Sequence, residues 1–357
     1  MKKLCTLLII ALTLVVTSLP AFAQYKSQYK LSVVPGAASG WGKSAQYFTD
    51  LVRERTDGRI NIKCYFSSQL LAGKQTSEFL MLRNGAIDFA MASTINWSPQ
   101  IKPLNLTALP FFLAMQDDRY KALDALSAGE AGKMMFAAIE KKGVKPIGWA
   151  ENGFRELTNS KRAVASPADI KGLKIRVVGS PIFIDAFKAL GANPVNMNWA
   201  EATTGFQQGV VDGQENPTNG INIPVKIWNY HNFITEWHYI IDPLITGVNP
   251  RVWKSFSKED QAIILECAKE AELYSKAISR VGLDDGSALA YLESINMVPT
   301  PAAPLVFLAE QGMTVTKLTP EQTKVFYDAT AGVREKWIPI IGEDLVNAAK
   351  ADIAASK

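Results

Sequence analysis

Strand and helix patterns alternate along two separate stretches of this chain, and that alternation limits the folds open to it. The first stretch predicts strands over 29–34, 60–66 and 87–92 and helices over 39–55 and 74–84. The second predicts strands over 173–178 and 194–197 and helices over 181–190 and 200–208. Repeated strand–helix units with short loops favour an open, mainly parallel sheet. The length exceeds what one core usually supports, so we expect two α/β domains.

Residues 1–23 have the features of a secretory leader, with Lys2 and Lys3, an apolar run and A-F-A before the cleavage point. That run is too short to span a bilayer comfortably, and no later stretch of ~20 apolar residues follows. We expect a soluble, exported, periplasmic protein without a lipid anchor, because Cys5 lies inside the leader. Removing Lys2 and Lys3 from the 38 basic residues leaves 36 against 34 acidic ones. This balance gives no reason to expect nucleic acid or an anionic membrane surface as a partner.

The longest helix pattern begins at Ser257, where Ser257 and Asp260 can satisfy free N–H groups of the first turn. It continues to about residue 295, with Gly282 and Gly286 as its weak points. At ~1.5 Å per residue such a helix would exceed ~50 Å. We therefore expect one helix that runs across both domains.

Two cysteines follow the leader. Cys64 lies on the inward-facing side of a predicted strand, and Cys267 lies in an apolar helix pattern. An exported protein could join them in a disulfide, but two buried free thiols are the simpler prediction.

Three motifs occupy the middle of the chain: G-F-R-E-L-T-N at 153–159, G-L-K-I-R-V at 172–177 and G-V-V-D-G-Q-E-N-P at 209–217. In the second motif Arg176 and Ile175 should face opposite sides of a strand. A buried arginine needs an anion, because an unpaired buried charge is costly. No acidic residue has an obvious cross-strand spacing, so we interpret the anion as a ligand; pairing with a nearby Asp or Glu is the alternative.

In this order and spacing the motifs resemble the periplasmic solute-binding proteins of TRAP transporters, the DctP family, from about residue 28 to about residue 340. The resemblance implies a periplasmic binding protein-like α/β fold, with two α/β domains around a ligand cleft and a long domain-spanning helix. We expect domain I to comprise 24–152 and 242–281, and domain II to comprise 153–241 and 282–357. The implied function is capture of an organic acid and its delivery to the small and large membrane subunits of a TRAP permease. A monomer is the default expectation.

The resemblance also assigns the two arginines. Arg176 would bind the ligand carboxylate through two parallel hydrogen bonds, which the rigid guanidinium fork allows. Arg155 would be a second ligand contact, with pairing to Glu156 or capping of a helix as the alternatives.

Two further residues of the second domain have implied roles. Asn216 would donate its amide to a carboxylate oxygen, and it could also form a turn before the following proline. Trp199 would pack on the carbon skeleton of the ligand, with ordinary core packing as the alternative. Gln214 and Glu215 are expected to shape the turn rather than touch the ligand.

The first domain should contribute residues that follow its strands, because open sheets bind ligands beyond the carboxyl ends of their strands. The candidates are Ser39 and Trp41 after the first strand, Gln75 after the second, and Ser93, Asn96 and Trp97 after the third. Gly179 and the small residues after the first strand offer few polar contacts. Together with the three tryptophans they favour a ligand more apolar than a short hydroxylated dicarboxylate.

No enzyme motif is found. His231 and His238 have neither a metal-ligand spacing nor a nucleophile partner, and we interpret them as surface or cleft-rim residues. Asp284 and Asp285 are interpreted as a solvated face of the long helix. The nucleophile elbow, the P-loop and the dinucleotide fingerprint do not occur. We expect no catalysis, metal or cofactor. A periplasmic sensor for a membrane receptor stays open as an alternative, as does a secreted enzyme.

Overall fold

The computed structural model describes residues 25–356, so the predicted leader lies outside the described residues. One sheet in the order β2-β1-β3-β8-β4-β7-β5-β6, with β9 paired to β8, runs through the molecule. Its strands are β1 (Tyr29–Ser32), β2 (Ile62–Tyr65), β3 (Phe89–Ser93), β4 (Lys145–Asn159), β5 (Lys174–Val177), β6 (Asn193–Asn196), β7 (Gly213–Pro217), β8 (Phe233–Val248) and β9 (Thr314–Lys317).

The sheet is parallel at both ends and antiparallel in the middle. β1 pairs in parallel with β2 and β3, and β5 does so with β6 and β7. Between them β8 runs antiparallel to β3 and β4, and β4 runs antiparallel to β7. The mainly parallel sheet that we predicted is thus correct at the ends only. Alternation does not predict β4 and β8, because their side chains are buried on both faces over most of their length.

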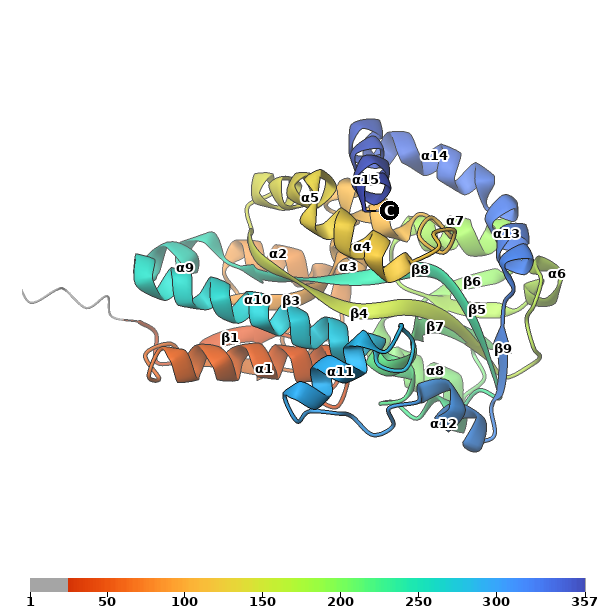
Figure 1. Ribbon diagram of the computed structural model, residues 1–357, viewed down its shortest axis with the longest axis horizontal. Coiled ribbons are helices and arrows are strands. Elements are labelled where there is room, and N and C mark those ends of the chain that lie inside the picture. The colour runs from red at the N-terminus through yellow and green to blue at the C-terminus, as the bar shows by residue number, and fades with distance from the viewer. Residues whose placement is uncertain (1–24, 357) are drawn as a thin grey trace, which may run out of the picture.

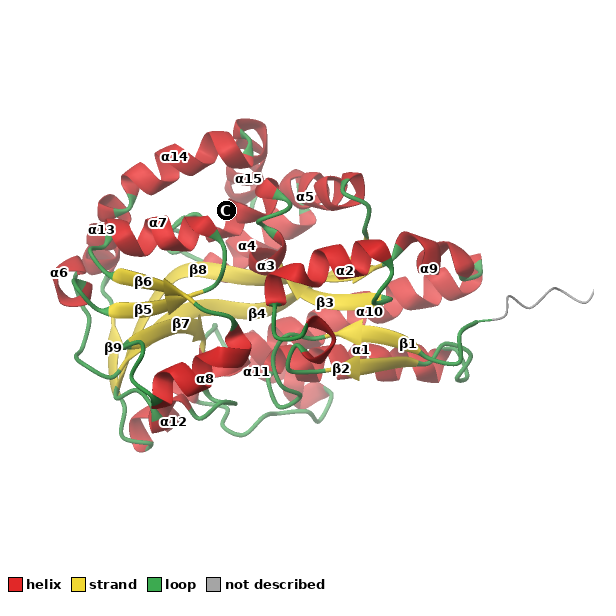
Figure 2. Ribbon diagram, turned by 180° about the vertical axis from the view of Figure 1, so that it is seen from behind, coloured by secondary structure: helices red, strands yellow, loops and turns green. Residues whose placement is uncertain are grey.

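Helices cover both faces of the sheet. They are α1 (Gly40–Arg55), α2 (Glu78–Asn84), α3 (Thr94–Trp97), α4 (Arg119–Ala128), α5 (Glu130–Lys141), α6 (Pro167–Ile170), α7 (Pro181–Ala189), α8 (Trp199–Gln207), α9 (Pro250–Ser255), α10 (Lys258–Arg280), α11 (Ser287–Ser294), α12 (Pro304–Glu310), α13 (Pro320–Ala329), α14 (Ala331–Ile341) and α15 (Glu343–Ala355). Figure 1 shows α4, α5, α14 and α15 above the strands and α1, α10 and α11 below them. The reverse view shows α8 and α12 on the lower side too (Figure 2). The result is a three-layer α/β molecule.

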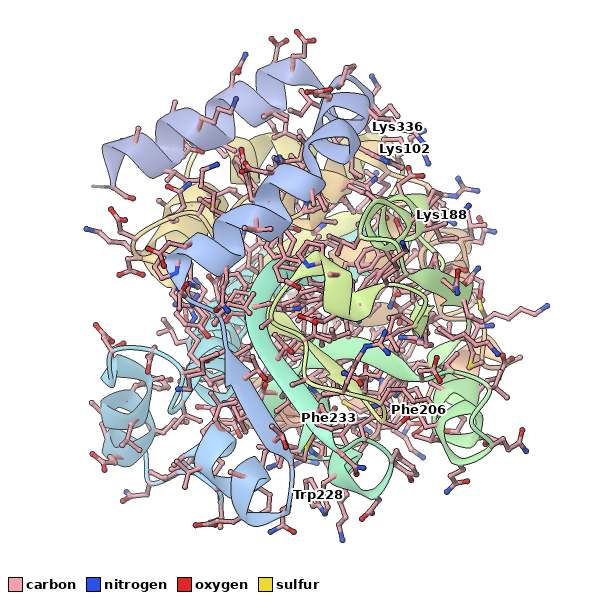
Figure 3. The ribbon with its side chains drawn as sticks, turned by 90° about the vertical axis from the view of Figure 1, so that its right-hand side faces the viewer. Lys102, Lys188, Phe206, Trp228, Phe233 and Lys336 are labelled. Atoms are coloured by element: carbon pink, nitrogen blue, oxygen red, sulfur yellow. The ribbon has the colours of Figure 1, made fainter. Side chains whose placement is uncertain are left out.

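The hydrophobic core follows these layers. The largest cluster lies between the sheet and the upper helices, and a second one joins β1, β2 and β3 to α1 and α10. A third, smaller cluster lies near β8 and β9, at the end of the molecule that faces the viewer in Figure 3. Phe206 belongs to it, and Trp228 packs against it. Within residues 25–356, no helix has both the length and the apolar character needed to cross a membrane.

The long helix that we predicted is in fact two helices. α10 ends at Arg280, and the backbone then turns through Gly282 and Gly286 at φ values of 71° and 98°. These left-handed conformations favour glycine and interrupt the helix. Asp284 accepts hydrogen bonds from the backbone N–H groups of Gly286 and Ala288, so it caps α11 and is not part of a solvated helix face. Asp285 accepts one from the N–H of Ser287 in the same turn.

Even shortened, α10 reaches from α1 to the segment that follows β7. Its 23 residues span about 35 Å at ~1.5 Å per residue. It packs beside α1 in the second core cluster, and near its C-terminal end the Asn219 amide donates to the carbonyl of Ser279 at 3.2 Å. Asn219 lies in the short helix η5 (Thr218–Asn222), which follows β7.

The two cysteines of the described chain are buried free thiols, as predicted. Burial raises the pKa of both Cys64 and Cys267 to about 11.

Candidate functional site

A small cavity lies where the carboxyl ends of the two parallel strand series meet. β1 and β3 end on it from one side, and β5 and β7 end on it from the other. Its wall is formed by Val34, Pro35, Trp41, Gln75, Ser93, Ile95, Asn96, Asn152, Arg155, Arg176, Val178, Trp199, Asn216, Ile221 and Asp242. Eight of the ten predicted contacts are on this wall, namely Arg176, Arg155, Asn216, Trp199, Trp41, Gln75, Ser93 and Asn96.

Arg176 lies on β5 between β6 and β7, where its side chain is 1% exposed. Its Nε donates to the carbonyl of Met197 at 2.9 Å, whereas its Nη2 has no hydrogen-bond partner. The Trp199 ring centroid is 5.5 Å from its Cζ. Among the described residues no carboxylate forms an ion pair with it. Burial lowers the pKa of Arg176 to about 10, although the charge of Glu215 acts in the opposite direction.

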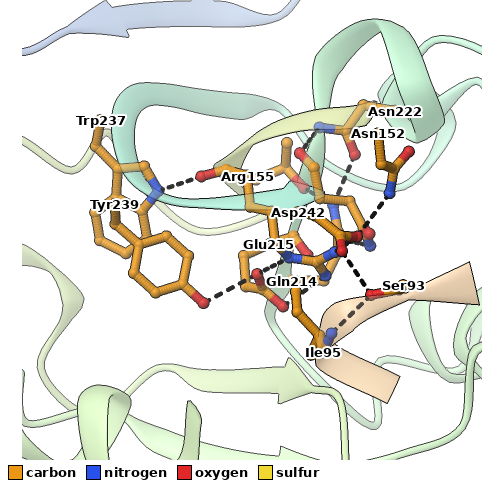
Figure 4. Close-up of polar contacts among 12 residues, drawn as sticks. Ser93, Ile95, Asn152, Arg155, Gln214, Glu215, Asn222, Trp237, Tyr239 and Asp242 are labelled. Atoms are coloured by element: carbon orange, nitrogen blue, oxygen red, sulfur yellow. Dashed lines mark hydrogen bonds and ion pairs between the residues drawn. The ribbon is translucent and has the colours of Figure 1, made fainter. Parts of the chain in front are cut away.

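Arg155 has a different environment, because two carboxylates neutralise it (Figure 4). Its Nε and Nη2 both donate to the Glu215 carboxylate, with 2.9 Å between Nη2 and Oε1, and its Nη1 donates to Asp242 Oδ2 at 3.2 Å. Burial alone would lower the pKa of Arg155, but the two carboxylates outweigh burial and raise it. Neither alternative from the sequence analysis holds: Arg155 does not pair with Glu156 and does not cap a helix.

Hydrogen-bond donors also hold the two carboxylates in place. Asp242 accepts from Ser93 Oγ at 2.5 Å and from Asn152 Nδ2 at 2.9 Å. Glu215 accepts from the Tyr239 hydroxyl at 3.0 Å. Burial raises the pKa of Asp242, and Arg155, Ser93 and Asn152 oppose that rise. Glu215 was expected to shape a turn, but it lies in β7 as a partner of Arg155.

A β-bulge turns Asn152 toward the cavity. The register between β4 and β8 shifts between Glu151 and Gly153, and Gly153 has a φ of 111°. Bulges of this kind redirect a side chain locally. Glycine is needed at the bulge because the conformation is left-handed, and an added Cβ would lie 3.3 Å from Pro217 Cβ.

Several contacts join the two sides of the cavity. Gln75 accepts a hydrogen bond from the backbone N–H of Trp199 at 2.7 Å and donates to Asn96 Oδ1 at 2.7 Å. Close by, a Cβ added to Gly179 would lie 3.3 Å from Thr76 Cγ2. The two sides are thus in contact around the cavity.

Asn216 and Trp41 are oriented by their own partners. The Asn216 amide donates to Gln214 Oε1, within strand β7 rather than in the predicted turn. Trp41 Nε1 donates to the carbonyl of Met91 at 2.7 Å. The Trp41 ring is almost fully buried and supplies part of the apolar wall.

Two predicted contacts do not lie on the cavity wall, and this corrects their assignment. Ser39 is the N-cap of α1, where its Oγ accepts from the N–H of Gly42 at 2.8 Å. Trp97 is fully buried in the core, and its Nε1 donates to Glu78 Oε2 at 3.3 Å. Both follow a strand as expected, but the Ser39 side chain caps α1 and the Trp97 side chain packs in the core.

The prediction that both histidines lie at the surface or the cleft rim is wrong for His231, which is buried, whereas His238 is half-buried. His231 Nδ1 lies 2.9 Å from Thr158 Oγ1, and burial lowers the pKa of His231 to about 3. His238 packs edge-on against Phe154, and burial lowers its pKa well below the usual value. Neither histidine lines the cavity. Residues 25–356 contain no group of three or more His, Cys, Asp or Glu side chains that could hold a metal ion.

The sequence analysis missed seven residues of the wall: Val34, Pro35, Ile95, Asn152, Val178, Ile221 and Asp242. One of them carried a usable signal. Asp242 interrupts the apolar run I-I-D-P-L-I, just as Arg176 interrupts its own strand. A charge in an apolar strand points to a buried partner or a ligand. The apolar residues and Asn152 carry no comparable signal.

A three-layer α/β molecule with a buried, arginine-lined cavity between two strand series defines a solute-binding protein of the periplasmic type. Residues 31–283 match the DctP family, described as bacterial extracellular solute-binding protein, family 7. The chain belongs to this family, the periplasmic solute-binding proteins of TRAP transporters.

Individual relatives agree with this assignment. A TRAP periplasmic solute-binding protein from Ralstonia eutropha H16, solved with bound (S)-2-acetolactate, is 47% identical; the match covers 93% of this chain and 100% of that one, with a TM-score of 0.83. A succinate-bound protein of the same class from Sulfurospirillum deleyianum DSM 6946 is 27% identical, over 92% and 99% of the two chains, with a TM-score of 0.76. The 2,3-diketo-L-gulonate-binding periplasmic protein YiaO of Escherichia coli (strain K12) is 35% identical over 66% of this chain and 70% of its own.

Proposed function

We propose that this protein captures a small organic carboxylate in the cavity and delivers it to the membrane subunits of a TRAP permease. In this proposal the leader at 1–23 directs export to the periplasm and is removed there. One observation carries the ligand class: Arg176 is buried, has no carboxylate partner among the described residues, and keeps Nη2 without an acceptor.

A carboxylate satisfies what Arg176 lacks. Burying a guanidinium without an anion is costly, and that cost is offset when a ligand carboxylate accepts its N–H groups. Trp199 lies over the guanidinium and would pack on the carbon skeleton beside it. Asn216 would add a neutral polar contact from β7.

The cavity favours a compact ligand. The space open to the centre of a water molecule is only ≈ 30 Å³, and about half of the wall is apolar. The relative from Ralstonia eutropha H16, at 47% identity, holds a branched five-carbon hydroxy-oxo acid, (S)-2-acetolactate. A ligand of that size and polarity fits the small, partly apolar wall better than a longer sugar acid.

Ligand capture would involve opening and closing of the two sides, because Arg176 is almost inaccessible when they are in contact. The chain divides into two proposed domains, 24–152 with 242–281 and 153–241 with 282–357. Two of the boundaries between them lie within β4 and within β8. These boundaries face each other, since Gly153 pairs with Asp242 across the β4–β8 ladder. In this proposal the bulge and the left-handed Gly153 at that point form the hinge. The permease would then recognise the closed form.

The test is a binding experiment on residues 24–357 with a panel of small organic acids, followed by thermal unfolding. A ligand at ~100 times its dissociation constant should stabilise the fold by ~2.7 kcal/mol. Arg176→Lys should weaken binding markedly, because an ammonium cannot form the two parallel hydrogen bonds.

Arg176→Met serves as the matched folding control. Removing an unpaired buried charge should leave the ligand-free protein at least as stable as the wild type while binding is lost. Carboxylate binding that survives in a folded Arg176→Met protein would overturn the proposal.

A further inference from the structure

Arg155 faces the cavity but does not offer it a free charge. Its Nε and Nη2 donate to Glu215, Nη2 also reaches the Glu215 carbonyl at 2.7 Å, and Nη1 donates to Asp242. Every nitrogen of this guanidinium therefore has an acceptor before a ligand enters. Arg176, by contrast, keeps Nη2 free.

Both partners of Arg155 are carboxyl groups that lie among hydrogen-bond donors. Ser93 Oγ accepts from the N–H of Ile95 at 3.1 Å, so its own proton is available for Asp242. Asp242 thus accepts from Ser93, Asn152 and Arg155. Glu215 accepts from Arg155 and from the Tyr239 hydroxyl. Hydrogen-bond donors of this kind stabilise the negative charge of a carboxylate.

The charges of the site follow from these contacts. Arg155, Arg176 and Asp242 are the charged residues on the described cavity wall, and Glu215 lies directly behind Arg155. Glu215 and Asp242 together carry one more negative charge than Arg155 neutralises. That extra negative charge balances Arg176 from a distance, so the four charges sum to zero, and Arg176 is the cation of the cavity wall without an ion-pair partner among the described residues.

We propose that Asp242 and Glu215 restrict this site to ligands with a single carboxylate, by cancelling the charge of Arg155. The proposal rests on the function proposed above, with Arg176 as the carboxylate-binding residue. A second carboxylate that reached Arg155 would lie beside Asp242 and would find no free cation. Like charges in a water-poor cavity repel strongly, so a dianion is excluded even when its shape fits.

The probes are two acids of matched shape. (S)-2-Acetolactate carries one carboxylate, and 2-hydroxy-2-methylmalonate replaces its acetyl group by a second carboxylate of almost the same size. Titration calorimetry at pH 8, where the carboxyl groups of both probes are ionised, gives the ratio of the two dissociation constants. Wild-type protein should bind the monoanion about 100-fold more tightly than the dianion, as expected for a like charge in a low-dielectric site.

Asp242→Asn removes the charge and keeps the shape, so the ratio should fall about tenfold or more, mainly because the dianion binds better. Glu215→Gln should shift the ratio in the same direction, and it carries the test if Asp242→Asn does not fold. Glu78→Gln is the matched control, since Glu78 is an equally buried carboxyl group that does not line the cavity. Its ratio should equal that of the wild type.

The outcomes separate this proposal from the one on which it rests. If the wild type binds the monoanion and Arg176→Met does not, the carboxylate function stands. Equal affinity of the wild type for both probes, or an unchanged ratio in the folded Asp242 and Glu215 variants, then overturns the selectivity proposal alone. Monoanion binding that is unaffected by Arg176→Met overturns the function proposed above, and the selectivity proposal with it.

Discussion

At the scale of single residues, several ionisable side chains are buried, and each has a different set of partners. Arg155 is neutralised by acids 60 and 87 residues away in sequence. Arg176 keeps a free donor that a ligand can use. Within residues 25–356, Glu78 is buried with two hydrogen-bond donors, the Ser32 hydroxyl and the Trp97 indole, and no cation. Burial raises the pKa of Glu78 to about 8.

This shift predicts a pH-dependent stability. Because the folded protein keeps the Glu78 proton to higher pH than the unfolded chain, the stability that this group contributes is full below the unfolded pKa, near 4.5, and is lost as pH rises through about 8. Glu78→Gln removes this loss. The unfolding free energy of the variant should therefore gain on the wild type by up to about 1.4 kcal/mol per pH unit between roughly pH 5 and 8.

Urea unfolding of both proteins at pH 5, 6.5 and 8 measures the difference. Glu156, whose pKa burial also raises to about 8, is present in both proteins, so its effect cancels in the comparison. A constant difference across the three pH values would contradict the assignment of the shift to Glu78.

At the scale of elements, the site depends on contacts between segments that local pattern does not relate. η3 (Gln75–Ser77) and the first turn of α8 meet through the hydrogen bond from the Trp199 N–H to Gln75. Gly179, just after β5, leaves room for Thr76 on the opposite side. The absence of a side chain at Gly179 thus allows the two sides to approach each other.

Gly179→Leu should hold the two sides apart. A side chain at this position would meet Thr76, so the closed state is disfavoured while each side keeps its fold. We expect ligand dissociation to become about tenfold faster or more, with little change in the association rate. Stopped-flow kinetics with a ligand from the panel gives both rates.

Gly332→Leu is the matched control, because an added Cβ at Gly332, in α14, meets nothing within 4 Å. It should dissociate at the wild-type rate. An unchanged dissociation rate in Gly179→Leu would show that this contact does not hold the closed state.

At the scale of the whole molecule, one continuous sheet joins both sides of the cavity. Its two long strands, β4 and β8, belong to both sides, and the ligand would lie between the two sides. Cys64 and Cys267 are buried in the same core cluster, which joins β1–β3 to α1 and α10. They therefore report on the opening of one side.

Ligand binding should protect both thiols. If the continuous sheet makes the chain unfold as one unit, a ligand at ~100 times its dissociation constant slows thiol labelling about 100-fold. Labelling with a thiol reagent in mild denaturant, followed by mass spectrometry, measures the rate at each cysteine. Ligand-independent labelling of either thiol would show that this side opens separately from the rest of the molecule.

The sequence by itself determined the strand–helix series, the arginine in an apolar strand and the family, because each depends on local pattern or on motifs of fixed spacing. Arg176 and most of the other predicted contacts lie on the cavity wall, since residues after parallel strands meet at one edge of a sheet. Only the tertiary structure decided that Arg155 is neutralised, that Ser39 and Trp97 do not line the cavity, that His231 is buried and that the long helix breaks at Gly282. These features depend on strand register and on packing between segments far apart in the chain, and neither has a local signature.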